Sequence, residues 1–346
     1  MSRPRQADIA RLAGVSQPTV SLILGGGAAA VGIAEETQRK VMEAAAQLGY
    51  MPDPIATRLA AGQNNLLGLY TFTSTFPTEM SHAYYPFLVG IEEESAAQGY
   101  DLLMFIASSI TGERPHAQVL NRVRLADGCL FLGRHLPVPE MDRLLATDLP
   151  VVYIGRHDEF GDRLPYVGAD YVSASAAVVR HLAGLGHERI LYVREADEAI
   201  TSVDREAGFR SGMDECGLAA AVVRTDGTDL TPERLRAWRE QGVTAMVTEA
   251  TDTDAAHRAL LVAAERAGLR FPDDLSLATL GDPRDRAAGL TGFAVPRREM
   301  GAAAVRLLTK LIAGDRTVLR HQLMACELEP GETAAPPRQP LERHHP

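Results

Sequence analysis

Three polar side chains near the start of the chain, Gln17, Thr19 and Ser21, are of the types that bond to base edges and phosphates. Glutamine can form a pair of hydrogen bonds to adenine, and a hydroxyl group can bond to several bases. For this chemistry the side chains have to project together from one rigid element that fits the major groove. The residues on both sides predict such an element.

Two short helices are predicted here, over Gln6–Ala13 and Gln17–Leu24. Apolar residues recur in both at helical spacing and predict a shared apolar contact: Ile9, Leu12, Ala13, Val20, Ile23 and Leu24. Gly14 permits a sharp turn between the helices, and Ser16 is suited to cap the second one by accepting a backbone hydrogen bond. The pattern is typical of a helix-turn-helix, although an ordinary helical hairpin would look similar at this level.

Two segments carry a family resemblance: IARLAGVSQPTVSLIL and EETQRKVMEAAAQLGYMPDPIATRLAAG. They are similar to the DNA-binding headpiece of the LacI/GalR family of bacterial transcriptional regulators, and the similarity continues through the whole chain. The resemblance implies that these residues contact DNA: Ser16, Gln17, Pro18, Thr19, Ser21 and Leu22. Leu22 and Gly25 stand where the family often has arginine and asparagine, so we expect a different operator preference, since leucine cannot donate to guanine.

A flexible loop is predicted from Gly25 to Ala30, longer than the family's usual turn, before a third helix over Glu35–Leu48. A glycine-rich loop can also cradle phosphate groups. This one lacks the preceding strand and the lysine that follows in such sites, so the phosphate interpretation is disfavoured.

Asp53, Pro54 and Gly62 mark a further short helix over about residues 53–61. Isolated helices below about 12 residues are marginal in water, so this one should need a partner. The resemblance implies that it folds in the minor groove beside the same helix of a second subunit. Leu59 would then wedge between base steps with Ala60 packed beside it. A plain linker role for Leu59 is the alternative.

Beyond residue 63, apolar stretches alternate with helical patterns, which predicts parallel sheets with crossover helices. The expected fold class is α/β, with an all-α headpiece (1–63) and a periplasmic-binding-protein-like body of two doubly wound lobes (64–330). By resemblance, the first lobe should cover about 64–160 plus 292–321, and the second about 161–291 plus 322–330. The tail, 331–346, is expected to be disordered.

Ligands of such bodies bind between the lobes, at the turns after the strands. The resemblance implies these ligand-facing residues: Tyr85, Phe87, Arg156, Arg205, Asp252 and Asp282. Arg205 matches a recurrent family arginine that donates paired hydrogen bonds, a surface arginine being the alternative. The rings of Tyr84, Tyr85 and Phe87 can stack on a sugar face or on an aromatic base, and core packing is the alternative role for Phe87. A sugar is the expected effector, although Gly155 and Gly281 replace carboxylates found in sugar-responsive relatives.

Charge supports a DNA-binding role only in part. Residues 1–63 contain six basic and five acidic residues, a net charge of +1, which leaves −11 for the rest of a chain whose total is −10. The headpiece therefore offers few phosphate contacts, and we expect a shallow dependence of DNA affinity on salt.

The remaining sequence patterns argue against metal-binding, membrane and enzyme classes of protein. Cys129, Cys216 and Cys326 form no zinc or disulfide pattern, so no metal or other cofactor and a reducing cytoplasm are expected. No export signal and no apolar run of about 18 residues is found, so no membrane association is expected. The absence of catalytic motifs such as HExxH predicts that the chain is not an enzyme. Without a terminal leucine heptad, a homodimer is expected.

Together these patterns predict a sequence-specific transcriptional regulator, acting as a repressor at a pseudo-palindromic DNA operator. A small-molecule effector between the lobes would change its operator affinity. The alternative is a small-molecule-binding protein without DNA-dependent activity. A discrete protected palindrome in footprinting distinguishes the two.

Overall fold

The computed structural model describes residues 4–25, 32–50, 64–71, 84–106, 121–133, 136–251, 253–282 and 289–338. The chain divides into two compact units, residues 1–66 with 125–127, and the remainder. The expected hinge segment 53–61, with Leu59 and Ala60, lies outside the described residues, as does most of the expected loop from Gly25 to Ala30.

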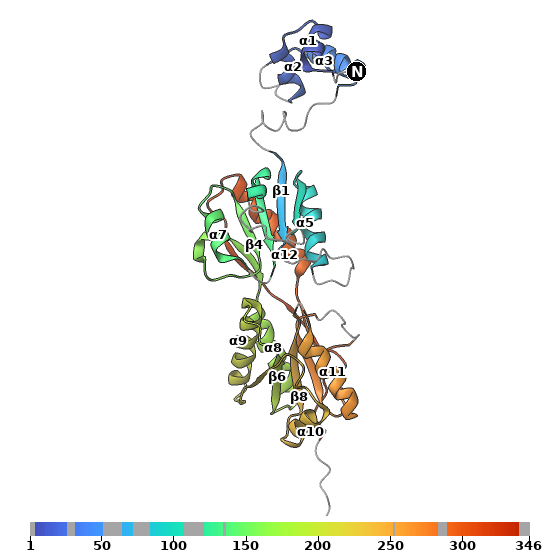
Figure 1. Ribbon diagram of the computed structural model, residues 1–346, viewed down its shortest axis with the longest axis vertical. Helices are drawn as coiled ribbons and strands as arrows, with labels where there is room; N and C mark the ends of the chain where they lie inside the picture. Colours follow the sequence, from blue (N-terminus) through green and yellow to red (C-terminus); the bar gives the residue numbers. More distant parts are fainter. Residues whose placement is uncertain are drawn as a thin grey trace, which may run out of the picture. The chain divides into compact units, whose positions relative to one another are not determined.

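The described part of the first unit consists of helices α1 (Gln6–Ala13), α2 (Gln17–Leu24) and α3 (Glu35–Gln47), shown in Figure 1. Their apolar faces form a small core whose buried members are Ile9, Ala10, Val20, Ile23, Val41, Ala44 and Ala45. Gly14 ends α1 with a φ of 69°, a conformation that suits glycine and permits the tight turn to α2. The predicted helix-turn-helix is confirmed, except that Leu12, expected in the shared apolar contact, is 48% exposed.

The first lobe of the second unit is built on a six-stranded sheet in the order β11-β5-β4-β3-β1-β2. Its strands are β1 (Leu66–Thr71), β2 (Asp101–Ile106), β3 (Gly128–Leu132), β4 (Val151–Ile154), β5 (Tyr166–Ala169) and β11 (His321–Met324). The pairs from β11 through β1 are parallel. The described helices of this lobe are α5 (Tyr85–Ala97), α7 (Val138–Leu145) and α12 (Arg297–Ile312), with 3-10 turns at Asn121–Leu125 and Gly161–Arg163.

The second lobe has a four-stranded parallel sheet in the order β7-β6-β8-β9. Its strands are β6 (Ile190–Arg194), β7 (Ala221–Arg224), β8 (Ala245–Glu249) and β9 (Ser276–Leu280), and its helices are α8 (Tyr171–Gly184), α9 (Ile200–Glu215), α10 (Pro232–Glu240) and α11 (Ala255–Ala267). The inner strands β6 and β8 are buried along their length because helices cover both faces of the sheet. An antiparallel pair, β10 (Gly292–Ala294) and β12 (Glu327–Glu329), lies where the chain passes between the lobes (Figure 1).

The boundaries between the lobes differ from those expected at residues 161 and 322. Strand β5 pairs with β4 and with β11, so the first lobe extends to Ala169 and again to Met324. The reason is backbone pairing: the four-residue strands β5 and β11 complete one edge of the first sheet before the chain passes into the second lobe. Strands this short give only a weak periodic signal in a sequence.

The segment from Gly331 to Arg338, expected to be disordered, is instead held against the second lobe. The backbone amide of Leu277 donates to the carbonyl oxygen of Thr333 at 2.8 Å. His187 is 1% exposed, and its Nε2 donates to the carbonyl oxygen of Ala335 at 3.0 Å. Burial lowers the pKa of His187, which keeps the ring neutral in this role. These polar contacts order a segment that has no apolar pattern of its own.

The close packing of α8 on α9 depends on Gly208. A side-chain carbon at this position would lie 2.2 Å from the backbone oxygen of Val172. We expect Gly208→Ala to push the helices apart and to lower the free energy of unfolding by about 1–3 kcal/mol, as overpacking does. Gly184→Ala is the control for denaturant unfolding, because nothing lies within 4 Å of its added carbon. Equal stability of the two variants would contradict the packing explanation.

Candidate DNA-reading helix and effector pocket

Helix α2 has a buried apolar face and an accessible polar face. Val20 and Ile23 are buried in the headpiece core. The exposed residues of this helix and its cap include Ser16, Gln17, Pro18, Ser21 and Leu22, while Thr19 is half-buried. The structure therefore brings six of the expected DNA contacts together on one short element, whereas Leu59 and Ala60 lie outside the described residues.

Ser16 caps α2 as the sequence predicts. Its Oγ accepts a hydrogen bond from the backbone amide of Thr19 at 3.3 Å and lies 2.8 Å from the Thr19 hydroxyl. The cap fixes the first turn, in which Gln17 and Pro18 stand. An amide and hydroxyls at this end of a helix suit both base edges and phosphate oxygens.

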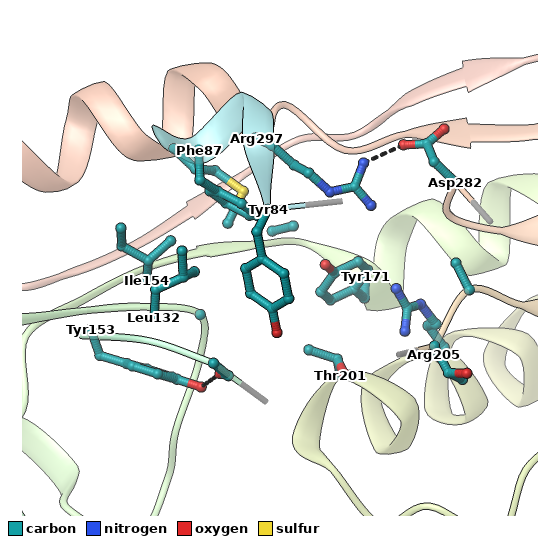
Figure 2. A pocket seen from close by; sticks show the side chains of 16 residues that line it. Tyr84, Phe87, Leu132, Tyr153, Ile154, Tyr171, Thr201, Arg205, Asp282 and Arg297 are labelled. Carbon is teal, nitrogen blue, oxygen red and sulfur yellow. Dashed lines mark hydrogen bonds and ion pairs between the residues drawn. The ribbon is translucent and has the colours of Figure 1, made fainter. Parts of the chain in front are cut away.

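A pocket lies between the two lobes of the second unit, at the carboxyl ends of the parallel strands (Figure 2). Its walls come from the ends of β3, β4, β5, β8 and β9 and from the first turns of α5, α8, α9 and α12. This is where α/β lobes bind small molecules, because side chains of both sheets converge there. The lining includes four aromatic rings, Tyr84, Phe87, Tyr153 and Tyr171, and two arginines, Arg205 and Arg297.

The expected ligand-facing residues divide into three groups. Phe87, Arg205 and Asp282 line the pocket. Tyr85 does not line it, but Tyr84 does, because its ring lies on the same side as Phe87, with 6.4 Å between ring centroids. Asp252 lies outside the described residues.

Arg156 does not line the pocket, and its guanidinium group is paired with two carboxylates, those of Asp204 and Asp158. Its Nε donates to Asp204 Oδ2 at 2.9 Å, a second nitrogen bonds to the other Asp204 oxygen, and a third bonds to Asp158. The hydrogen bond to Asp204 is the main cause that raises the pKa of Arg156. Arg156 follows β4 in the first lobe and Asp204 lies on α9 in the second, so this ion pair links the lobes. We therefore no longer propose Arg156 as a ligand contact.

Arg205 is held by stacking. Its Cζ lies 4.3 Å from the centroid of the Tyr171 ring, and its Nη1 is 3.7 Å from Glu249 Oε2, too far for a hydrogen bond. The residue is 3% exposed, and its Nε and Nη1 have no hydrogen-bond acceptor among the described residues. A ligand acceptor in the pocket is what this guanidinium lacks.

Several lining residues were not expected from the sequence: Tyr153, Tyr171, Thr201 and Arg297. Tyr153 donates to the carbonyl oxygen of Gly133 at 2.5 Å, and Arg297 Nη1 donates to Asp282 at 2.5 Å. Tyr171, Thr201 and Arg297 lie in the first turns of α8, α9 and α12, and Tyr153 lies near the end of β4, positions that could have pointed to them. The partners of Tyr153 and Arg297 are 20 and 15 residues away in the sequence, and only the fold identifies them.

Among the described residues, neither a metal-binding group nor a membrane-spanning helix is found. No group of three His, Cys, Asp or Glu side chains is arranged to hold a metal ion. No described helix has the length and the apolar character needed to span a membrane.

Residues 7–53 match the family of bacterial regulatory proteins of the lacI type, and residues 179–334 match the periplasmic binding protein-like domain. Catabolite control protein A of Priestia megaterium is 27% identical over 321 residues, which are 88% of this chain and 91% of that protein. The chain thus combines a LacI-type DNA-binding domain with a periplasmic-binding-protein-like domain, and its homologues are LacI-family regulators. With these two domains it is a DNA-binding transcriptional regulator, with a helix-turn-helix headpiece and a two-lobed ligand-binding body.

Solved LacI-family structures share the fold. The lac repressor dimer bound to operator and the anti-inducer ONPF has a TM-score of 0.72 at 20% identity, covering 96% of this chain and 100% of that one. The complex of the transcriptional regulator CelR with cellobiose has a TM-score of 0.64 at 21% identity, with the same coverage of both chains.

Proposed function

We propose that this chain is a repressor whose affinity for a pseudo-palindromic operator is set by a sugar bound between its lobes. The headpiece, residues 1–63 with a hinge at about 53–61, would bind DNA, and the body, residues 64–330, would hold the effector. One observation carries the proposal: a capped helix with an exposed polar face and a pocket with an unsatisfied arginine belong to the same chain. A dimer on operator DNA is supported by the lac repressor structure, and a sugar effector by the CelR complex.

In the proposed DNA complex, each subunit of a homodimer places α2 in the major groove of one half-site. Gln17 reads adenine, the hydroxyl groups of Thr19 and Ser21 bond to bases or phosphates, and Leu22 contacts a thymine methyl group. The two hinge segments, with Leu59 and Ala60, are proposed to occupy the minor groove at the centre of the operator.

In the proposed response, the effector changes how the two lobes close on each other. The pocket lies between the lobes, and its lining residues Gly155 and Arg205 are direct neighbours of the Arg156–Asp204 pair. A ligand that binds one degree of closure more tightly shifts the population toward it and changes the operator affinity of the dimer. We propose release of the operator on ligand binding, in the cytoplasm where the operator lies. We propose no catalytic role, since the relatives are regulators.

The experiment has two parts. Selection from a random duplex pool, followed by footprinting, should give one protected palindrome. Arg205→Ala should then keep that footprint but lose the release caused by an effector found in a sugar and nucleoside panel. We expect a loss of effector affinity of about tenfold or more, because a charge-assisted hydrogen bond is removed.

Arg180→Ala is the matched control, because Arg180 pairs with Glu215 on the surface of the same lobe. It should leave both the footprint and the release unchanged. Binding of a small molecule without any protected duplex would contradict the proposed function and identify a binding protein without DNA activity.

A further inference from the structure

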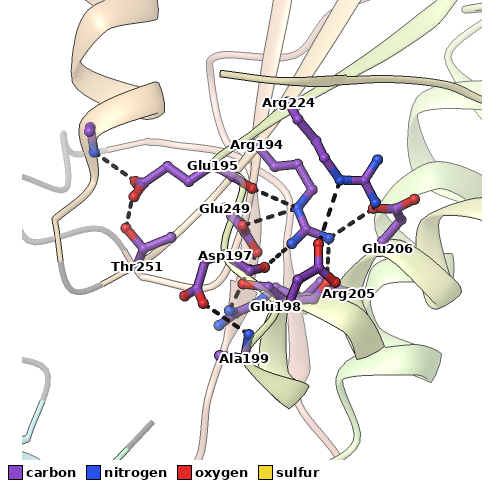
Figure 3. Close-up of polar contacts among 12 residues, drawn as sticks. Arg194, Glu195, Asp197, Glu198, Ala199, Arg205, Glu206, Arg224, Glu249 and Thr251 are labelled. Carbon is purple, nitrogen blue, oxygen red and sulfur yellow. Dashed lines mark hydrogen bonds and ion pairs between the residues drawn. The ribbon is translucent and has the colours of Figure 1, made fainter. Parts of the chain in front are cut away.

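Two charged residues stand at the carboxyl end of β6, Arg194 in the strand and Glu195 directly after it (Figure 3). Arg194 is 1% exposed, and its Nη1 donates to Glu206 at 2.8 Å. The same guanidinium group donates to the backbone carbonyl oxygens of Glu195 at 3.0 Å and Ser202 at 3.2 Å, and to that of Asp197. Because a guanidinium group has its donors in a fixed geometry, Arg194 fixes the path of the chain from the end of β6 to the first turn of α9.

Glu195 reaches from this fixed strand end to the residues that follow β8. Its Oε1 accepts hydrogen bonds from the Thr251 hydroxyl group at 2.7 Å and from the backbone amide of Ala255 at 2.8 Å. Its Oε2 accepts a hydrogen bond from the Thr253 hydroxyl group at 2.6 Å. Figure 3 shows the carboxylate pointing toward Thr251. One carboxylate thus joins the loop after β6 to the start of α11.

Helix α11 begins without a capping bond of its own. Asp254 is its N-cap residue, but the Asp254 side chain makes no capping bond and instead accepts from the backbone amide of Thr251 at 2.8 Å. Its φ of 50° is uncommon for a residue with a side chain and occurs where the surroundings hold the backbone in place. The Glu195 carboxylate takes the place of the missing cap, because it bonds to the amide of Ala255, the first helical residue, where an anion is favoured.

The Thr251 hydroxyl group is fully used by these contacts. It donates its proton to Glu195, and it accepts from the backbone amides of Asp254 at 2.8 Å and Thr253 at 3.2 Å. A hydroxyl group has one donor and two acceptor sites, so no donor is left for a ligand. Thr251 lines the pocket, whereas Glu195 does not.

We propose that Glu195 is a positioning residue of the pocket: it holds Thr251 in one place in the second-lobe wall and takes up its hydroxyl proton, without touching the ligand. This inference rests on the proposed function, in which the pocket is the effector site. A wall that is fixed in advance loses less conformational entropy when a ligand binds, so its contacts contribute more to affinity. Arg194 supports the arrangement from behind, because it holds the backbone of Glu195.

The test is NMR of the unliganded full-length chain, labelled with carbon-13 at the threonine methyl groups. In the parent protein Thr251 and Thr253 should each give one sharp methyl signal. In Glu195→Ala both signals should shift or broaden. The backbone amide of Ala255 should exchange with solvent about tenfold or more faster, because it loses a hydrogen bond to a charged group. Thr248, buried in β8, should keep its signal and show that the fold is intact.

Glu195→Gln separates positioning from a general loss of charge. Glutamine keeps one acceptor oxygen, which in the place of Oε1 can still bond to Thr251 and Ala255. Its amide nitrogen cannot accept the hydrogen bond from Thr253. We therefore expect the Thr251 signal and the Ala255 exchange rate to return to those of the parent protein, while the Thr253 signal stays shifted.

Glu215→Ala is the matched control, because Glu215 bonds to Arg180 and Ser211 on the surface of the same lobe. It should leave all of these signals unchanged. An unchanged Thr251 signal with an unchanged Ala255 exchange rate in Glu195→Ala would overturn the proposal. Changes that extend to Thr248 would overturn it as well, because they would show a loss of the fold as a whole.

Failure of this proposal and failure of the proposed function give different results. The NMR signals are recorded without DNA and without an effector, so an unchanged Thr251 signal refutes the positioning role and leaves the proposed function standing. If no duplex is protected in footprinting, the proposed function is wrong whatever the Thr251 signal shows.

Discussion

Replacing Arg156 with glutamine should weaken effector binding by about ten- to hundredfold and open the two lobes. Arg156 and Asp204 form a two-point ion pair between the lobes, and Asp204 is 6% exposed. Removing the cation leaves a buried carboxylate without its partner, which is costly in the closed arrangement and relieved by opening. The ligand must then supply the free energy of closure, so its apparent affinity falls.

Small-angle scattering of the unliganded protein and calorimetry with the effector measure the two effects. Arg163→Gln is the control, because Arg163 pairs with Asp142 within the first lobe and both side chains are about half exposed. The double variant Arg156→Gln, Asp204→Asn removes both charges and should recover part of the affinity. An unchanged scattering profile with unchanged affinity in Arg156→Gln would show that the pair does not hold the lobes together.

Replacing Leu22 with arginine should change which operator the headpiece selects. Leu22 is 39% exposed on the accessible face of α2, so a longer side chain fits without disturbing the core. An arginine there can donate a pair of hydrogen bonds to guanine, and a good pair of this kind contributes about 1–3 kcal/mol of discrimination. We expect one new guanine in each half-site, preferred by about ten- to hundredfold.

Selection from a random duplex pool measures this change directly. Leu22→Ala is the comparison variant, because it removes the contact with a thymine methyl group without adding a donor. It should relax the preference at the same position and gain no guanine. If Leu22→Arg selects the same duplexes as the parent protein, α2 does not read that position of the operator.

Local patterns were enough to predict the headpiece. The cap at Ser16, the glycine turn and the apolar spacing act over a few residues, and the structure has both helices at the predicted bounds. The alternation of strands and helices likewise predicted two parallel sheets, because that rhythm is set by covering both faces of a sheet. These features depend on short-range chemistry that a sequence displays.

Long-range pairing could not be predicted in the same way. Arg156 was expected to face the ligand, but its partner Asp204 stands 48 residues away and only the fold brings them together. The segment from Gly331 to Arg338 was expected to be disordered because it lacks an apolar pattern, yet backbone bonds and His187 hold it. Tyr153 and Arg297 line the pocket and bond to Gly133 and Asp282, partners that the sequence does not identify.

The most direct test of control by the pocket is the ratio of operator dissociation constants with and without a bound ligand. Coupling is reciprocal, so operator DNA has to change the affinity for the ligand by the same factor. We expect a factor of about 5–150 in both directions, lost in Arg205→Ala. A ligand that needs Arg205 for binding but leaves the operator dissociation constant unchanged would contradict control of the operator by the pocket.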